Sequence, residues 1–201
     1  MNILSNVSNP KMILRGLKVI TYTMMGWEMP LPYHDRYILE QKIIPFFIEQ
    51  KEFTKVLFVG CGSYTKHYEK WFSKKEYWTI DINPMKKIYG AKKHITGSMS
   101  DLNLYFKEND LDLILCNGVF GWGLNERKDV EDAFLGCYQS LRQGGVLVLG
   151  WDDLPEKKPF PLETCESLNR FQSYFFPPLS TSQYRNVADK SEKHVFNFYV
   201  K

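Results

Sequence analysis

The sequence predicts an α/β domain whose doubly wound, mostly parallel sheet ends in an antiparallel hairpin. Between residues 55 and 149, short apolar runs alternate with helical patterns, which is typical of consecutive strand–helix units. The last two apolar runs are separated by a short charged turn that leaves no room for a crossover helix, so we expect these two strands to be antiparallel.

The composition indicates one globular domain that binds neither nucleic acid nor metal. The 201 residues, 44% hydrophobic and 15% aromatic, suffice for one sizeable core but not comfortably for two. The formal net charge is only +3 and the lysines are mixed with acids, so we expect no nucleic-acid partner. The four cysteines lack the spacing of a zinc site or a disulfide framework, which favours reduced thiols in a cytoplasmic protein.

Residues 1–35 are expected to form a lid or appendage in front of the main domain, which we place at 36–201. Prolines and glycines interrupt residues 1–32, and Arg15 and Lys18 interrupt the apolar stretch 12–20, so we expect no integral membrane segment. The alternatives for this stretch are a packed N-terminal helix or contact with a membrane surface. Residues 33–50 have a helical pattern that Pro45 should kink or restart.

The chain then contains seven candidate strands, each a short run rich in apolar, aromatic or β-branched residues. They are 55–59, 77–80, 94–96, 111–116, 146–149, 183–187 and 195–200. Apolar residues at helical spacing predict a helix over 64–72 after the first strand and another before the fifth. Asn125 can cap that second helix, and Gly144 with Gly145 should end it.

Ligands of such sheets bind beyond the carboxyl ends of the strands, so the loops that follow the strands are the candidate site. Gly60 and Gly62 after the first strand permit a tight turn and close approach of a ligand, toward which the next helix would point its free N–H groups. Asp81 ends the second strand about twenty residues later, where a carboxylate can accept hydrogen bonds from both hydroxyls of a ribose. Its alternative role is to cap the turn at Asn83 and Pro84.

The loop after the third strand, 97–101, is a second candidate element of this site. It could cover a flat adenine ring with an apolar side chain and a backbone N–H group. Alternatively it is an ordinary loop in which Ser100 or Asp101 caps the next helix.

Taken in order, these signals resemble the class I S-adenosylmethionine-dependent methyltransferases from about Phe53 to Lys201. The segments 56–62, 111–119 and 141–148 are similar to the family's first motif, its fourth strand with the active-site loop, and its helix leading into strand five. The resemblance implies a Rossmann-like, seven-stranded sheet, S-adenosyl-L-methionine as cofactor and S-adenosyl-L-homocysteine as product. The cofactor-binding residues that it implies are Gly60, Cys61, Gly62, Asp81, Ile82, Ser98, Met99, Asn117 and Gly118.

Three positions depart from the family pattern. Phe58 and Ser98 stand where the family usually has acids, and Tyr64 stands where it usually has a third glycine. These departures favour one alternative, a non-catalytic cofactor-binding or scaffold protein on the same fold. Another alternative is a nicotinamide-dependent oxidoreductase. Its Gly-x-Gly-x-x-Gly motif requires a third glycine at position 65, where the chain has Thr65.

The expected reaction is methyl transfer to a small molecule without metal, because the sulfonium is already activated and the protein needs chiefly to align the reactants and exclude water. Candidate substrate residues are Tyr33 and His34 before the first strand, Trp122 after the fourth and Asp152 after the fifth, beside Asp153. Their alternatives are an exposed or capping histidine, a buried tryptophan and solvated carboxylates. An aromatic face beside a carboxylate would suit an amine or another compact basic metabolite.

The other three histidines receive no predicted role. His67 and His94 are expected on the surface in lysine-rich segments, and His194 at the start of the last strand.

Overall fold

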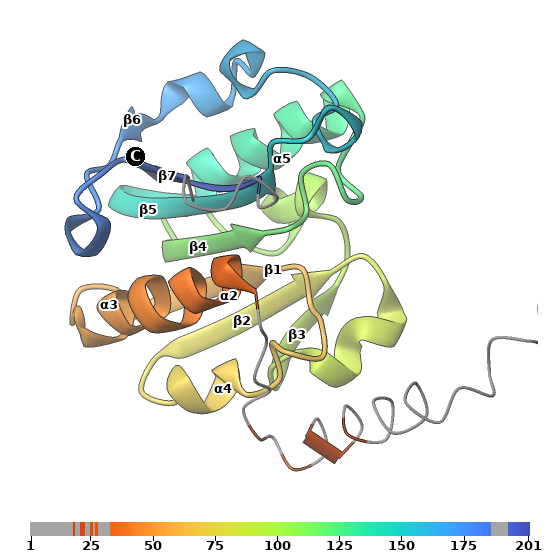
Figure 1. Ribbon diagram of the computed structural model, residues 1–201, viewed down its shortest axis with the longest axis vertical. Coiled ribbons are helices and arrows are strands. Elements are labelled where there is room, and N and C mark those ends of the chain that lie inside the picture. The colour runs from red at the N-terminus through yellow and green to blue at the C-terminus, as the bar shows by residue number, and fades with distance from the viewer. Residues whose placement is uncertain (1–17, 19–20, 23–24, 26, 28–32, 186–192) are drawn as a thin grey trace, which may run out of the picture.

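The computed structural model describes residues 18, 21–22, 25, 27, 33–185 and 193–201. Most of the expected lid, residues 1–35, lies outside the described residues. The rest forms three layers, with the sheet in the middle and helices on both of its faces (Figure 1). In the described part of the chain, no helix is long and apolar enough to cross a membrane.

The sheet confirms the predicted fold class. Its strands are β1 (Lys55–Val59), β2 (Glu76–Asp81), β3 (Lys93–Thr96), β4 (Leu111–Asn117), β5 (Leu141–Asp152), β6 (Gln172–Ser173), β7 (Gln183–Arg185) and β8 (His194–Val200). The order is β3-β2-β1-β4-β5-β8-β6, and β7 also pairs with β8. The first five strands in this order are parallel, whereas β8 is antiparallel to β5, β6 and β7. The two-residue β6 was not predicted, because so short a strand leaves no hydrophobic pattern.

The helical run directly before the sheet restarts at Pro45, as expected. It consists of α2 (His34–Ile38), the π-helical turn η2 (Leu39–Ile43) and α3 (Ile44–Glu49), with Pro45 in the first turn of α3. Proline has no N–H group to donate to the preceding turn, and the π-helical turn accommodates this missing hydrogen bond.

Two of the predicted helices have the wrong boundaries. The helix α4 (Tyr68–Trp71) has only four residues and begins well beyond the glycine turn, so it points no N–H groups at that turn. The helix α5 (Arg127–Ser140) begins after Glu126 rather than at Asn125. It ends before the glycine pair because Leu141 is already extended and pairs with Leu111 of β4.

The remaining helical turns are short 3-10 segments. They are η3 (Pro84–Tyr89), η4 (Met99–Leu104), η5 (Pro155–Lys157), η6 (Leu162–Thr164), η7 (Leu168–Arg170) and η8 (Pro177–Leu179). Of these, η3 and η4 directly follow strands β2 and β3, and therefore border the carboxyl edge of the sheet.

Strand β4 is buried on both faces of the sheet along its whole length. On one face Ile114 packs in the core that contains Phe134 of α5, and on the other Leu113 packs in the core that contains Phe47 of α3. Each such side chain contributes about 1.5–3 kcal/mol by leaving water. The loop after β4 therefore extends from a rigid strand.

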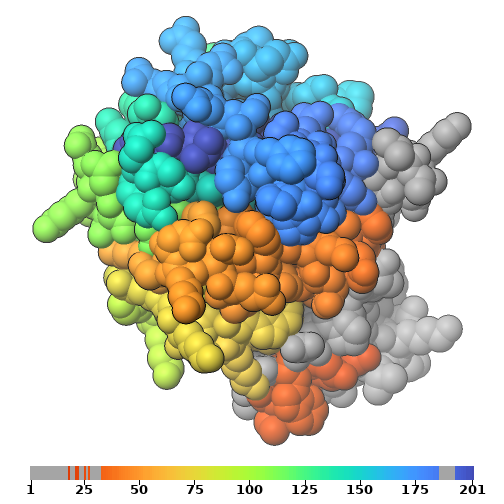
Figure 2. All heavy atoms as spheres, turned by 90° about the vertical axis from the view of Figure 1, so that its left-hand side faces the viewer, coloured from red at the N-terminus to blue at the C-terminus, as the bar shows by residue number. Residues whose placement is uncertain are grey.

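The helices α2 and α3 pack against the C-terminal part of the chain, and Figure 2 shows their orange atoms beside the blue atoms that precede the last strand. Phe176 forms the centre of this contact. Its ring lies 5.8 Å from that of Phe47 and stacks at 4.4 Å on that of Phe198 in β8. The first and last parts of the domain thus share one aromatic cluster.

At the amino end of β4, Asp112 joins three segments of the chain. Its carboxylate accepts hydrogen bonds from the backbone N–H groups of Thr54 and Lys55, both at 2.7 Å, and from Arg142 Nε at 2.6 Å. Burial alone would raise the pKa of Asp112, but these hydrogen bonds lower it overall.

Two histidines differ from the surface positions expected for them. His67 is only 1% exposed and contacts the rings of both Tyr68 and Trp71 edge-on, because the turn before α4 faces the core. His94 is half-buried, with its Nδ1 atom 2.9 Å from Thr79 Oγ1.

Candidate functional site

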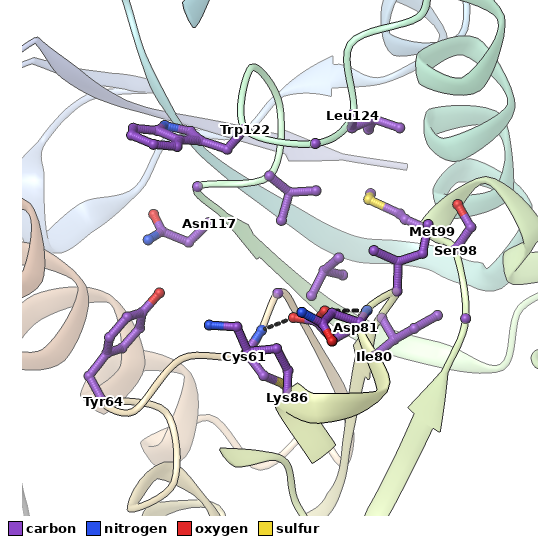
Figure 3. A pocket seen from close by; sticks show the side chains of 18 residues that line it. Cys61, Tyr64, Ile80, Asp81, Lys86, Ser98, Met99, Asn117, Trp122 and Leu124 are labelled. Atoms are coloured by element: carbon purple, nitrogen blue, oxygen red, sulfur yellow. Dashed lines mark hydrogen bonds between the residues drawn. The ribbon is translucent and has the colours of Figure 1, made fainter. Parts of the chain in front are cut away.

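A cavity of about 340 Å³ opens at the carboxyl ends of β1, β2 and β4, where the sequence places the ligand site (Figure 3). Eight of the nine predicted cofactor residues line it, and only Gly62 does not. Those that line it are Gly60, Cys61, Asp81, Ile82, Ser98, Met99, Asn117 and Gly118.

The turn after β1 requires glycine at its first position. Gly60 has φ +85°, and a Cβ atom there would come within 2.8 Å of Val119 Cγ2. The N–H group of Cys61 donates to Asp81 Oδ2 at 2.7 Å, and that of Gly62 donates to Thr65 Oγ1 at 3.2 Å. Both N–H groups of the turn are therefore engaged within the protein.

Asp81 has two roles at once. Besides Cys61, it binds the N–H group of Asn83 through Oδ1 at 2.8 Å, so the turn-capping role considered above is present. Each carboxylate oxygen has a further lone pair, and Asp81 also lines the cavity, so it retains the capacity to accept hydrogen bonds from a ligand.

The wall formed by the loop after β3 is partly apolar. Met99 is buried, and Ile82 of the preceding loop is 72% exposed at the rim. Ser98, rather than Ser100 or Asp101, caps the next helical turn, because its side chain accepts a hydrogen bond from the N–H group of Ser100 at 3.1 Å.

The positions that depart from the family pattern have different surroundings. Phe58 is fully buried, with its ring 5.4 Å from that of Tyr68, and contributes nothing to the cavity wall. Tyr64 does line the cavity, and the guanidinium of Arg36 stacks 3.2 Å from its ring centroid. Sequence reasoning missed Arg36, which is only 8% exposed, because nothing in the α2 segment marks an arginine as buried.

The cysteine in the wall is no nucleophile. Burial and then the charge of Asp81 raise the pKa of the Cys61 thiol to about 12, so the thiolate is scarcely populated at neutral pH. All four cysteines are free and buried. Within the described residues, no group of histidine, cysteine and acidic side chains could hold a metal ion.

Trp122 closes the cavity at the end of β4, and the alternative that it is a core residue is wrong. Its side chain is 57% exposed and its indole Nε1–H group donates to Asp152 Oδ2 at 2.8 Å. The ammonium group of Lys157 lies 3.4 Å from the ring centroid. Gly121 makes this approach feasible, because a Cβ atom there would lie 1.8 Å from the Lys157 carbonyl oxygen.

Behind Trp122, Asp152 pairs with a histidine that sequence reasoning left without a role. His194 Nδ1 lies 2.6 Å from Asp152 Oδ1, and His194 Nε2 lies 3.0 Å from Asn117 Oδ1. The hydrogen bond from His194 is the main cause that lowers the pKa of Asp152, so this carboxylate is ionised at neutral pH. The neighbouring Asp153 forms ion pairs with Lys158 and Arg185, both at 2.7 Å.

The structure does not bring the other two candidate substrate residues to the cavity wall. Tyr33 is exposed just before α2. His34 begins α2 and its Nε2 atom lies 2.8 Å from Tyr184 Oη of β7. Neither residue lines the cavity.

Comparisons with known proteins agree with this geometry. Residues 57–149 match the family model of a methyltransferase domain. The chain is similar to a TehB-like SAM-dependent methyltransferase from Corynebacterium glutamicum, with a TM-score of 0.57 and 15% identity over 96% of this chain and 100% of that one. It is also similar to the N-methyltransferase NodS from Bradyrhizobium japonicum in complex with S-adenosyl-L-homocysteine, with a TM-score of 0.55 and 12% identity over 97% and 89% of the two chains. No curated protein matches the sequence significantly.

Proposed function

We propose that this chain is a class I S-adenosyl-L-methionine-dependent methyltransferase, as the match of residues 57–149 to a methyltransferase domain supports, and that it methylates a small molecule bound at the end of the cavity between Asn117 and Trp122. The observation that carries the proposal is the cavity wall at this end, which Asn117, Gly118 and the exposed side chain of Trp122 form beside the turn after β4. A compact acceptor fits such a recess better than a polymer does.

The cavity suits the cofactor at its adenosine end. Gly60 leaves space that a Cβ atom would fill, Asp81 retains lone pairs for the ribose hydroxyls, and Ile82 and Met99 offer apolar surface to the adenine. When bound, S-adenosyl-L-methionine supplies a methyl group already activated on a sulfonium. We therefore propose that the protein contributes alignment and exclusion of water, with no metal required.

The charges beside Trp122 favour a small acceptor over a nucleic acid. Lys158 and Arg185 pair with Asp153, and Lys157 covers the indole ring, so these cations are already engaged. A nucleic acid would need a free basic stripe to neutralise its phosphates.

The same contacts weaken the expectation of a basic amine as substrate. An ammonium ion would compete with Lys157 for Trp122, and with His194 for Asp152. A compact polar acceptor without a strong positive charge fits these engaged groups better.

The test combines binding and turnover. Calorimetry should give saturable heat with S-adenosyl-L-homocysteine, and a screen with methyl-labelled S-adenosyl-L-methionine should give turnover on phenols, carboxylates or amines that chelator does not abolish. Turnover confined to short oligonucleotides would contradict the small-molecule proposal, while binding without turnover on any acceptor would favour the scaffold alternative. Heat with a nicotinamide cofactor instead would favour the oxidoreductase.

Two further parts of the proposal concern the whole protein. We place it in the cytoplasm, which its four free thiols support. Residues 1–35 act as a lid in this proposal, and slower amide exchange in them when cofactor and acceptor are both bound is the expected result.

A further inference from the structure

A chain of hydrogen-bonded side chains runs behind the wall at the acceptor end of the cavity. It passes from Trp122 to Asp152, then to His194 and to Asn117, with distances of 2.8, 2.6 and 3.0 Å. Trp122 and Asn117 line the cavity, whereas Asp152 and His194 stand behind it. Figure 3 shows the Asn117 amide directed into the space between Tyr64 and Trp122.

The register of three strands assembles this chain. Asp152 of β5 is paired with His194 of β8, and Gly150 of β5 is paired with Asn117 of β4. A Cβ atom at Gly150 would lie 1.9 Å from Asn117 Oδ1 and 2.8 Å from His194 Nε2. Glycine at this position therefore leaves the space in which the amide and the imidazole meet.

The partners of His194 fix where its protons lie. An ionised carboxylate only accepts hydrogen bonds, so the Nδ1 atom that faces Asp152 carries a proton. The Nε2 atom faces the amide oxygen of Asn117, which also only accepts, so a hydrogen bond between these two atoms requires a proton on Nε2 as well. With its oxygen held in this way, Asn117 turns its –NH₂ group toward the cavity.

Loss of the Nε2 proton would reverse the arrangement. The lone pair of Nε2 would then face the lone pairs of Oδ1, and the amide would have to rotate to donate its own N–H group instead. Its oxygen would then face the cavity. One proton on His194 thus decides whether Asn117 offers the cavity a donor or an acceptor.

We propose that the Asp152–His194 pair positions the Asn117 amide and so selects an acceptor molecule that carries a hydrogen-bond-accepting oxygen, such as a carboxylate or carbonyl, beside its nucleophile. This inference rests on the proposed function, since it concerns the acceptor of that reaction. His194 is a positioning residue, because it acts through Asn117 and does not line the cavity.

Several charged groups lie around His194. Asp152 faces it from β5, Lys157 of η5 lies beyond the Trp122 ring, and Asp153 is already paired with Lys158 and Arg185. With a proton on Nε2 the Asn117 amide presents its donor to the cavity, and without that proton it presents its oxygen.

Nuclear magnetic resonance tests the linkage without any methyl transfer. The sample is ¹⁵N-labelled full-length protein saturated with S-adenosyl-L-homocysteine, in which the side-chain amide signal of Asn117 is assigned by its loss in Asn117→Asp. The chemical shift of this signal should change with the same midpoint pH as the ring nitrogens of His194. In His194→Gln, whose amide can still donate to Asn117, the Asn117 signal should be independent of pH. If the chemical shift of the Asn117 amide in the wild-type protein does not change as His194 titrates, the inference is overturned.

A matched pair of probes tests the acceptor class. Salicylate and 2-hydroxybenzylamine share a ring and a hydroxyl group but carry a carboxylate or an ammonium group beside it. At low pH the complex with S-adenosyl-L-homocysteine should bind salicylate about tenfold more tightly, the size expected for one hydrogen bond to a charged group. The preference should fall as pH rises in the wild-type protein and stay constant in His194→Gln.

The outcomes separate this inference from the proposed function. Equal binding of the two probes, or binding of neither at millimolar concentration, would overturn the acceptor class even if methyl transfer to another small molecule is found. An unfolding transition of His194→Gln in urea that matches the wild-type transition is the control for correct folding.

Discussion

Replacing Asp81 by alanine should weaken binding of S-adenosyl-L-homocysteine by one to two orders of magnitude. A hydrogen bond to a charged group contributes about 1.5–3 kcal/mol, which corresponds to roughly a 10- to 150-fold change in affinity. The structure adds a second effect, because the N–H group of Cys61, 2.7 Å from Asp81 Oδ2, would lose its acceptor and the turn after β1 would be held less firmly. We therefore expect a loss toward the upper end of this range.

Asp81→Asn separates the two effects. The amide oxygen can still accept from Cys61, but the charge that strengthens hydrogen bonds from ribose hydroxyls is gone, so the loss should be intermediate. Calorimetric titration measures all three affinities. Asp110→Asn is the matched control, because Asp110 pairs with Lys55 at 2.7 Å at the opposite edge of the sheet. If Asp81→Ala binds the ligand as tightly as the wild-type protein, the assignment of Asp81 to the cofactor is refuted.

Three further substitutions test other parts of the structure. Gly60→Ala forces a side chain into a positive-φ position and should cost about 1–3 kcal/mol of unfolding free energy in urea titration along with most of the ligand affinity; retention of both would show that the turn relaxes freely. Asp112→Ala should cost about 3–5 kcal/mol, since it leaves Arg142 and two backbone donors without their acceptor, while ligand affinity stays the same in calorimetry; a cost below about 1 kcal/mol would contradict this. Because the pKa of Asp112 is lowered, its stabilisation is complete above the ordinary carboxyl pKa, about 3.9, and should disappear in wild-type urea titrations as pH falls below it. Trp122→Phe keeps an aromatic wall but removes the donor to Asp152, so it should lower turnover of the screened acceptor several-fold without changing affinity for S-adenosyl-L-homocysteine; equal turnover would show that this hydrogen bond is dispensable.

That most of the predicted cofactor residues line one cavity could be foreseen from the sequence for a geometric reason. Gly60, Asp81 and Asn117 each lie at the carboxyl end of a parallel strand, and parallel strands bring those ends to one edge. The strand order did not have to be known in detail, because the carboxyl ends of all parallel strands lie at the same edge of the sheet.

The acceptor end depends on contacts that no local pattern encodes. His194 lies 42 residues from Asp152 and 77 from Asn117, and it meets them only through the register of β8 on β5 and of β5 on β4. The covering of Trp122 by Lys157 likewise depends on how η5 folds back over the loop after β4. Such tertiary contacts override what the surrounding sequence suggests.

The helix predicted over residues 64–72 is shorter in the structure, where α4 spans Tyr68–Trp71, and the difference has a local cause. Tyr64 and Tyr68 have helical spacing, but Thr65 bonds through its hydroxyl to the carbonyl of Gly62 at 2.8 Å and to that of Tyr89 at 3.0 Å. These hydrogen bonds hold the segment in a turn, since threonine side chains compete with the helical backbone for partners. Tyr64 is thereby left at the cavity wall, where Arg36 stacks on it.

The position of β8 has a consequence for how the protein acquires activity during synthesis. Although β8 comes last among the strands in the chain, it lies inside the sheet, between β5 and the pair β6 and β7. A growing polypeptide that has not yet reached residue 194 leaves the edge of β5 unpaired, and such an edge is a site for aggregation. Until then it also lacks the imidazole that orients Asn117. A nascent chain can therefore form the turn at Gly60 and Asp81 before Asn117 is held by His194, and the insertion of one strand both seals the sheet and completes the hydrogen-bonded chain behind the cavity.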